Sequence, residues 1–202
     1  PPKPPEPGQV DGASVTTTVT TNPEGQTVTT LVVAPVPVNR VEDGSTANAA
    51  LADITLAKDG GGAALISVGL PVGVGIESET LSGGSLTLRQ MLVGASQARL
   101  GEGAALSQII QDGIDQYLPT LTLKAAPDAV AAGTLAQPIV ITGAVGTGEA
   151  SALHPHRGEA LVIDARQLPA GAVLQLDNVE FAIVIGNCTV VGGSGRNFVV
   201  GD

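Results

Sequence analysis

Aromatic residues are nearly missing from this 202-residue chain, which has one Tyr, two Phe and no Trp. Aromatic rings supply the surfaces on which sugars and bases stack, and they anchor many protein–protein hot spots. Their scarcity argues against a ligand site built on stacking. The apolar share of 43% comes mainly from aliphatic residues, alongside 27 Gly. A composition rich in Gly, Thr and Val with few charges favours thin, repetitive β-structure.

Cysteine is almost missing too, because Cys188 is the only one. No intramolecular disulfide can form, which excludes a disulfide-stapled secreted domain. No apolar run approaches the roughly 18 residues of a membrane-spanning helix, so no membrane insertion is expected. The opening Pro-Pro-Lys-Pro-Pro-Glu-Pro contains no secretory signal segment. An opening without Met predicts a processed product or a part of a longer chain.

Basic residues are also few: 9 Lys and Arg stand against 19 Asp and Glu, for a formal net charge of −10. A nucleic-acid-binding protein needs a basic face, so nucleic acid is not an expected partner. The same charge argues against binding to anionic membranes. Surface carboxylates can collect divalent cations, although solubility through self-repulsion is the simpler interpretation.

The sequence TTTVTTNPEGQTVTT, at residues 16–30, predicts a β-hairpin. Pro23 presets φ for a type I turn, Asn22 can bond its own backbone, and Gly25 can take the positive φ that follows. Thr occurs on both solvent-exposed and half-buried faces of strands, so the sequence does not show which face of the hairpin packs on a core. Pro-rich segments precede and follow the hairpin. This pattern predicts an arm over residues 1–39 that protrudes from the rest of the chain.

An isolated two-stranded hairpin is marginal in water, so the arm is expected to dock on other β-structure. Adding it to the sheet of another copy would form a main-chain ladder between the two molecules. Alternate side chains would then enter pockets of the partner. The residues expected to make this contact are Val15, Thr17, Val19, Val28, Leu31 and Val33.

The remaining residues, 40–202, are expected to form a β-rich body. Apolar spacing of i, i+3, i+4 and i+7 predicts a helical hairpin at about 86–118 that packs on a sheet. Strands closely spaced from about 160 to 202, with Gly at the corners, predict a solenoid-like end. The expected fold is therefore mainly β, a sandwich or roll with one helical hairpin and a protruding N-terminal arm. Expected strands of the body include 53–57, 64–68, 138–142, 160–164, 172–176, 179–185, 188–191 and 198–200.

Sites of chemistry are hard to find in the sequence. His154 and His156, with Glu149 and Glu159 nearby, have the form of a loose metal cluster, but a zinc site needs three or four converging ligands. Cys188 lies in an apolar strand pattern and is expected to be a buried small hydrophobe. The Gly-rich runs lack the spacing of a phosphate-binding loop or a nucleophile elbow. The chain is therefore not expected to be an enzyme.

GGSGRNFVV, at residues 192–200, matches the nonapeptide G-G-x-G-x-D-x-U-x except that Asn197 replaces Asp. In this stretch the chain resembles the calcium-binding RTX (repeats-in-toxin) proteins of Gram-negative bacteria. The order of the Thr-rich stretch, "LADITL", "SVGLPVGVG", "SLTLRQMLVGASQA" and "NVEFAIVIG" is similar to the region ahead of the repeats in large secreted surface proteins. The resemblance implies type I secretion and an extracellular location. It also implies calcium as a possible ligand, with Asn197 and Asp202 as the candidate metal residues, although Asn197 supplies no charge.

Three functional interpretations follow from these features. The first is an extracellular structural protein that self-associates through its arm, as a filament, surface-layer or adhesin subunit. The second is a non-assembling N-terminal binding module of a larger calcium-dependent RTX-type secreted protein. The third is a secreted enzyme of unrecognised type, for which a pocket of clustered Asp, Glu and His would be the evidence. The expected partners are further copies of the chain, and a surface polysaccharide is a further possibility.

Overall fold

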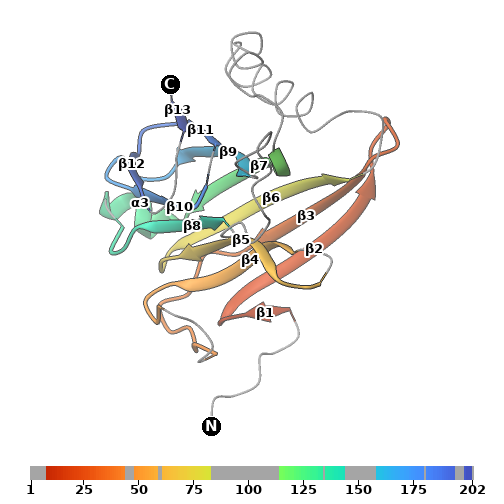
Figure 1. Cartoon of the computed structure of the whole chain (residues 1–202). Helices are drawn as coiled ribbons and strands as arrows, with labels where there is room; N and C mark the ends of the chain where they lie inside the picture. The colour runs from red at the N-terminus through yellow and green to blue at the C-terminus, as the bar shows by residue number, and fades with distance from the viewer. Residues whose placement is uncertain are drawn as a thin grey trace.

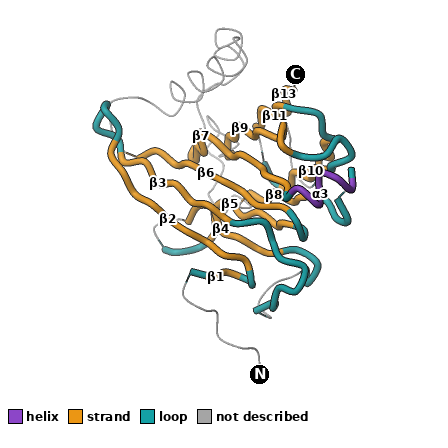
Figure 2. Tube along the Cα trace, turned by 180° about the vertical axis from the view of Figure 1, so that it is seen from behind, coloured by secondary structure: helices purple, strands orange, loops and turns teal. Residues whose placement is uncertain are grey.

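The computed structural model describes residues 8–43, 48–58, 61–82, 114–133, 135–143, 158–179, 181–193 and 198–201. These residues form two β-sheets that face each other as a sandwich, with one short helix at the side (Figure 1; seen from behind in Figure 2). The protein is therefore mainly β, as its composition predicts.

The larger sheet has eight strands. In spatial order they are β1 (Gln9–Val10), β2 (Ala13–Thr21), β3 (Thr27–Val33), β6 (Val74–Ser82), β7 (Ile114–Ala125), β9 (Gly158–Gln167), β11 (Phe181–Ile185) and β13 (Phe198–Gly201). The smaller sheet has five strands. In spatial order they are β12 (Thr189–Gly192), β10 (Val173–Asp177), β8 (Ile139–Gly143), β5 (Ala64–Leu70) and β4 (Ala52–Lys58). The helix α3 (Pro127–Ala132) connects β7 to β8.

Both sheets change from antiparallel to parallel pairing partway across. In the larger sheet β7 pairs antiparallel with β6 and parallel with β9. In the smaller sheet β8 pairs antiparallel with β5 and parallel with β10. From β8 onward the chain alternates between the two sheets, one strand at a time. Each sheet is thus half antiparallel sandwich and half parallel coil.

The parallel half, from β8 to β13, is called the coil below. Its successive turns stack in register: Val173 pairs with Thr189, sixteen positions later, and Phe181 pairs with Phe198, seventeen positions later. Each turn contributes one strand to each sheet. The solenoid-like end expected over residues 160–202 stays a prediction.

The core lies between the two sheets and is built from aliphatic side chains. Alternate residues of each strand point inward, as in β8, where Ile139 and Ile141 are fully buried and Val140 is only partly so. Each fully buried Ile or Leu contributes about 1.5–3 kcal/mol relative to exposure. The largest fully buried side chains are Ile54, Ile66, Leu70, Ile76, Leu121, Leu123, Ile139, Ile141, Leu161 and Ile163.

The threonine hairpin, β2 and β3, does not protrude as a separate arm. β3 pairs with β6 at seven successive positions, so the hairpin forms the outer part of the larger sheet. After β3 the main chain stays in contact with β6, because Val36 N donates to Val74 O (3.1 Å) and Gly73 N donates to Val36 O (2.9 Å). Val33 and Val36 are buried in the core. The expectation of a detached arm missed this long-range pairing, which no local pattern encodes.

Gly75 permits the close approach of the segment that leaves the hairpin. A Cβ atom at this position would lie 2.5 Å from Val33 O and 2.8 Å from Pro35 N, closer than real contacts allow. The Pro-rich stretch after the hairpin therefore packs on β6 and is not a free hinge.

The predicted helical hairpin at 86–118 falls largely outside the described residues, but its last part is described and is not helical. Ile114 and Tyr117 lie in strand β7. Pro119 also lies in β7, where the register with β9 shifts between Leu118 and Leu121. A shift of this kind accommodates Pro in a strand, since the ladder is interrupted there. The spacing of the apolar residues fits both a helix and a strand.

Candidate functional site

The free edges of the sheets are the surfaces that can pair with further β-structure. Within the described residues the larger sheet ends at β13 on one side and at β1 and β2 on the other, and the smaller sheet ends at β12 and β4. Three of these edges carry recognised protection against unwanted pairing. β12 and β13 have four residues each, while β4 has two register shifts and ends in Lys58. Strand β2 has nine residues, no charge, no Pro and no shift against β3.

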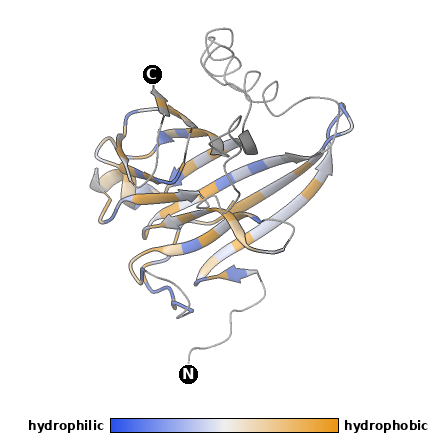
Figure 3. Ribbon diagram, in the orientation of Figure 1, coloured by the Kyte–Doolittle hydropathy of each residue, from blue (hydrophilic) through white to orange (hydrophobic). Residues whose placement is uncertain are grey.

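Counting only the described residues, most of β2 has a strand on one side only. β1 pairs with just Ala13 and Ser14, and Gly8 O accepts a bond from Val15 N (2.7 Å). From residue 16 to residue 21 every side chain of β2 is exposed. This six-residue stretch is called the free edge below. In Figure 3 the hairpin strands are mostly pale, because the hydropathy of Thr is near the middle of the scale.

The pairing with β3 determines which residues of the free edge point their main-chain N–H and C=O groups outward. Val15 N points toward β1, whereas Ser14 O accepts from Ala34 N on the β3 side (3.0 Å). Since successive residues of an antiparallel strand point their main-chain groups to opposite sides, Thr17, Val19 and Thr21 point theirs away from β3. No pairing partner for these three lies among the residues the structure describes. They form a row of available donors and acceptors.

The tip of the hairpin is a tight, hydrogen-bonded turn. Gly25 N donates to Asn22 O (3.0 Å), and Gly25 has the positive φ of 76° that the sequence predicts. Asn22 Oδ1 accepts from Gln26 N (2.8 Å), while Asn22 Nδ2 donates to Gln26 Oε1 (3.0 Å). These bonds set the register of β2 against β3. The free edge is therefore presented by an ordered hairpin.

The base of the hairpin is held by a buried ion pair that the sequence analysis did not anticipate. Arg40 Nη1 lies 2.9 Å from Asp11 Oδ1, and the two side chains are 6% and 0% exposed. Arg40 Nη2 also donates to the carbonyls of Ala49 (2.5 Å) and Leu51 (2.6 Å). Asp11 Oδ2 accepts from Asp53 N (3.0 Å), at the start of β4. The pair links the N-terminal segment to the smaller sheet.

Asp11 itself occupies a strained turn with a positive φ of 46°, followed by Gly12 with φ of 73°. A Cβ atom on Gly12 would lie 2.7 Å from Val41 O, so the chain packs closely here. Burial raises the pKa of the nearby Asp53 carboxyl, and the Asp11 carboxylate raises it further, against the opposing effect of Arg40. An Asp-Gly dipeptide is a turn signal, and it is the only local clue to this anchor.

The six residues predicted to contact a partner divide into two groups. Val15 and Leu31 pack against the core of their own chain, and Val33 is buried in it. Val33 is therefore not available to pockets of another copy, whereas Val15 and Leu31 are partly exposed. Thr17 and Val19 are exposed on the free edge, and Val28 is partly exposed on β3. Val19 is 63% exposed although it shares a face with Val15, because the far end of the hairpin extends beyond the smaller sheet (Figure 1).

The last turn of the coil is the second candidate surface. Gly193 N donates to Leu176 O (2.8 Å), and Thr189 N donates to Ala172 O (2.9 Å), so β12 is tied to β10 at both ends. A Cβ atom on Gly193 would lie 1.4 Å from Asp177 Oδ1, which makes Gly the residue that fits this corner. Asn197 and Asp202, the candidate metal residues, lie outside the described residues.

Side chains that could bind a metal or act in catalysis do not form a cluster among the described residues. Among the described residues no three His, Cys, Asp or Glu side chains come together as a metal-binding group. His154 and His156 lie outside these residues. Cys188 is half-buried against the core, and burial raises the pKa of its thiol. Cys188 thus resembles the small hydrophobe that its sequence context predicts.

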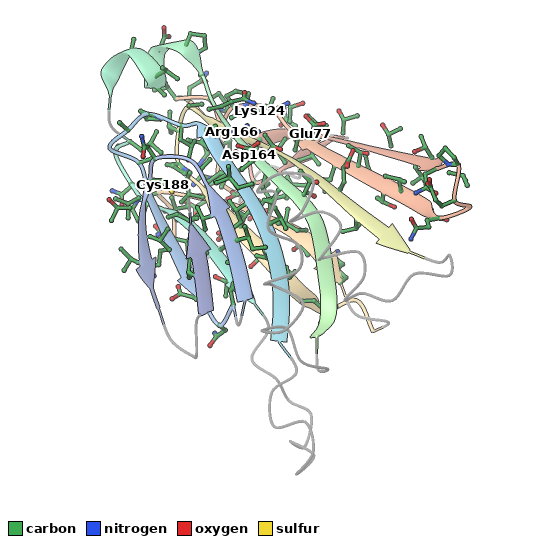
Figure 4. The ribbon with its side chains drawn as sticks, turned by 90° about the horizontal axis from the view of Figure 1, so that it is seen from above. Glu77, Lys124, Asp164, Arg166 and Cys188 are labelled. Carbon is green, nitrogen blue, oxygen red and sulfur yellow. The ribbon has the colours of Figure 1, made fainter. Side chains whose placement is uncertain are left out.

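Two ion pairs lie on neighbouring strands of the larger sheet (Figure 4). Lys124 on β7 pairs with Glu77 on β6. Arg166 on β9 binds Asp164 through two bonds, from Nε to Oδ1 (3.0 Å) and from Nη2 to Oδ2 (2.6 Å). Beside Arg166 is an open surface hollow of about 470 Å³, lined by Ala165, Arg166, Leu168, Ala170, Gly186 and Asn187. Among the described residues of this lining there is no nucleophile and no carboxylate.

Comparison of the chain with protein-family models, with curated proteins and with solved structures gives no match. Across the described residues, no helix has both the length and the apolar character needed to cross a membrane. The function is therefore inferred from the chain's own sheet edges and packing.

Proposed function

We propose that this chain is a structural module of a secreted surface protein, in which the antiparallel sandwich caps and templates the parallel coil. The observation that carries the proposal is the double pairing of β7 and β8. Each has an antiparallel neighbour on one side and a parallel neighbour on the other. One continuous core passes from the sandwich into the coil, because buried residues of β4, β5 and β6 belong to the same cluster as those of β9, β10 and β11.

The short strands of the coil would pair more readily on a sheet edge that is already folded. β10 and β11 have five residues each, and β12 and β13 have four. Parallel pairing requires a loop to close before any contact forms, which makes it slow and costly to begin. Solenoids also need a terminal cap, since an end turn otherwise exposes its apolar face. Here β7 and β8 supply a preformed edge on which the first coil turn is laid.

The outer strands of the coil are too short to pair well with a long foreign strand, but they match the four- and five-residue strands of the coil's own turns. β12 and β13 lie at the same end of the two sheets, and their outer edges have no partner strand among the described residues. Val191 and Val199 on these strands are partly exposed. We propose that a further parallel turn of β-structure pairs there. The acidic composition and the single, half-buried Cys suit an extracellular, calcium-containing environment.

The test is to add turns and ask what they need in order to fold. A second copy of residues 173–201 is fused after Asp202, and its amide hydrogen exchange is measured by mass spectrometry. The added segment should be protected on this chain and unprotected as a free peptide. A matched fusion in which the two Leu residues of the added copy (equivalent to Leu174 and Leu176) are Asp should stay unprotected.

Repeating the measurement with calcium and with a chelator separates templating from metal-driven folding. Protection in both conditions supports templating by the sandwich. If the added copy stays unprotected on the chain, or the free peptide is equally protected, the proposed capping function is wrong.

A specific observation favours self-association as a second function. The free edge of β2 is long and uncharged, whereas the other described edges are short, irregular or charged. An unprotected edge of this kind is a template for strand addition. On this proposal copies of the chain join through β2, which supplies one of the contacts that a filament or surface layer needs. Sedimentation velocity checks it, because a single monomeric species at all concentrations up to about 1 mM would remove it.

A further inference from the structure

The free edge of β2 contains a palindromic stretch of five residues. Residues 17–21 are Thr-Thr-Val-Thr-Thr, which is the same in both directions about Val19. A twofold axis places residue i of one copy against j of the other, and j against i. We propose that β2 pairs antiparallel with β2 of a second copy, with Val19 on the axis. The proposal rests on self-association as a function and specifies its geometry.

The backbone polarity of the free edge fits this register. Residues that point their N–H and C=O toward the partner strand form the hydrogen-bonded pairs of an antiparallel ladder. Thr17, Val19 and Thr21 point outward, as shown above. With Val19 on the axis, Thr17 faces Thr21 of the second copy and Val19 faces Val19. Every hydrogen-bonded pair of the new ladder thus joins two outward-facing residues, and the two larger sheets become one.

The side chains of the free edge are also self-complementary in this register. Thr18 faces Thr20, and Thr–Thr pairs are favourable across strands. Val19, 63% exposed in one copy, covers Val19 of the other. β2 contains no charged residue, so no like charges are opposed across the ladder. If one copy of β2 were moved by one residue, Val19 would face Thr18 or Thr20 of the other copy. The main-chain groups of those residues point toward their own β3 and could not bond across the new contact.

A second copy is a better occupant than a charged peptide, because the free edge offers no charge to select one. The contact is small, well below the roughly 1,000 Å² of a stable interface, so the association is weak and reversible. Each copy carries a net charge of −10, which opposes approach. Salt screens this repulsion, so pairing should strengthen as ionic strength rises.

Cysteine cross-linking tests the register. In a Cys188→Ala background, Val19→Cys places the two cysteines opposite each other, with Cα atoms about 5.5 Å apart, within the range of a disulfide. Thr16→Cys is the matched control on the same exposed strand. Its two copies would lie about 20 Å apart, since residue 16 faces residue 22. Mild oxidation should cross-link the first variant and leave the second without a covalent cross-link.

A charge on the axis tests the surface without cysteine chemistry. Val19→Lys brings two ammonium groups together and should weaken dimerisation at least tenfold in sedimentation equilibrium. Val38→Lys makes the same change at a position that is 88% exposed and lies outside β2. It should leave the dimerisation constant within twofold of the parent value. Circular dichroism confirms that both variants are folded.

The outcomes separate the pairing from self-association itself. Selective cross-linking at residue 19, with weakening by Val19→Lys alone, supports the proposal. If the parent dimerises and Val19→Lys dimerises equally well, self-association is retained and this pairing is wrong. The same conclusion follows if cysteines at residues 16 and 19 cross-link to the same extent. A parent that stays monomeric up to about 1 mM overturns both.

Discussion

The hairpin and the coil differ in how their sequences specify their places in the fold. The hairpin has Thr on both faces, and its long strands are positioned by β6 and by the Asp11–Arg40 ion pair at its base. The coil has strands of four or five residues whose inward positions are aliphatic, such as Leu174 and Leu176. A segment with a weak hydrophobic pattern is thus held by a specific polar anchor. A segment with a strong pattern is held by packing.

The largest effect should come from removing the polar anchor of the hairpin. Arg40→Met leaves the fully buried Asp11 carboxylate without its cation, which should lower the free energy of unfolding by about 3–5 kcal/mol. Urea unfolding measures the change. The control is Lys124→Met on β7, where Lys124 and its partner Glu77 are 42% and 37% exposed and the loss should stay below about 1 kcal/mol. Equal losses would contradict the distinction between the two pairs.

Truncating the coil core tests the role of packing there. Leu174→Ala removes a fully buried side chain of β10 and should lower the free energy of unfolding by about 2–5 kcal/mol. The matched control Val191→Ala, on the exposed β12, should change it by less than about 0.5 kcal/mol. Hydrogen exchange should show greater loss of protection in β10 and β12 than in β2 and β3. A uniform loss would mean that the two regions unfold as one unit.

Glycine substitutions compare a coil corner with the hairpin turn. Gly186 has φ of 114°, and its Cβ would lie 2.8 Å from Arg166 N, so Gly186→Ala should cost about 2–3 kcal/mol. Gly25 also has a positive φ, but no atom lies within 4 Å of its Cβ position. Gly25→Ala should therefore cost only about 1 kcal/mol. Thermal unfolding measures both, and a reversed order would show that the coil corner can relax.

The smallest effect should be a pH dependence at the anchor. Burial, followed by the Asp11 carboxylate, raises the pKa of Asp53 above its ordinary value of 3.8. The folded state therefore binds this proton more tightly than the unfolded state. The associated stabilisation is complete below pH 3.8 and is lost as pH rises through the raised pKa.

Asp53→Asn removes that loss, so the variant should gain stability relative to the parent as pH rises from about 3.8 to 7. Denaturant unfolding across this range measures the difference. A difference that shrinks with rising pH would reverse the inferred sign.

Much of the secondary structure could be predicted from local patterns. The Asn22 to Gly25 turn follows from its residue types, and alternation marked strands close to β4, β5, β8, β10 and β12. β7 was missed in part, because the spacing of Ile114, Tyr117 and Leu118 fits a helix as well as a strand. Short apolar segments leave this ambiguity, and the parallel neighbour β9 resolves it in favour of a strand.

The candidate sites were predicted less completely than the strands. An exposed Val19 follows from the hairpin pattern, but the burial of Val15 and Val33 depends on β6 and the smaller sheet, which are distant in sequence. The Asp11–Arg40 pair could not be predicted, because the two residues are 29 positions apart and no local motif links them. The candidate calcium residues Asn197 and Asp202 stay a prediction.

Local chemistry specifies the strands, the turns and the uncharged, palindromic edge of β2, because backbone preferences and side-chain alternation act over a few residues. Long-range packing selects which strands are neighbours, which face of the hairpin is buried and where the sheets become parallel. These choices depend on contacts such as β3 with β6 and β7 with β9, which bring together residues separated by about forty or more positions. The stabilisation from these contacts is present only when both strands are in place, so a short stretch of sequence does not predict which strands will pair.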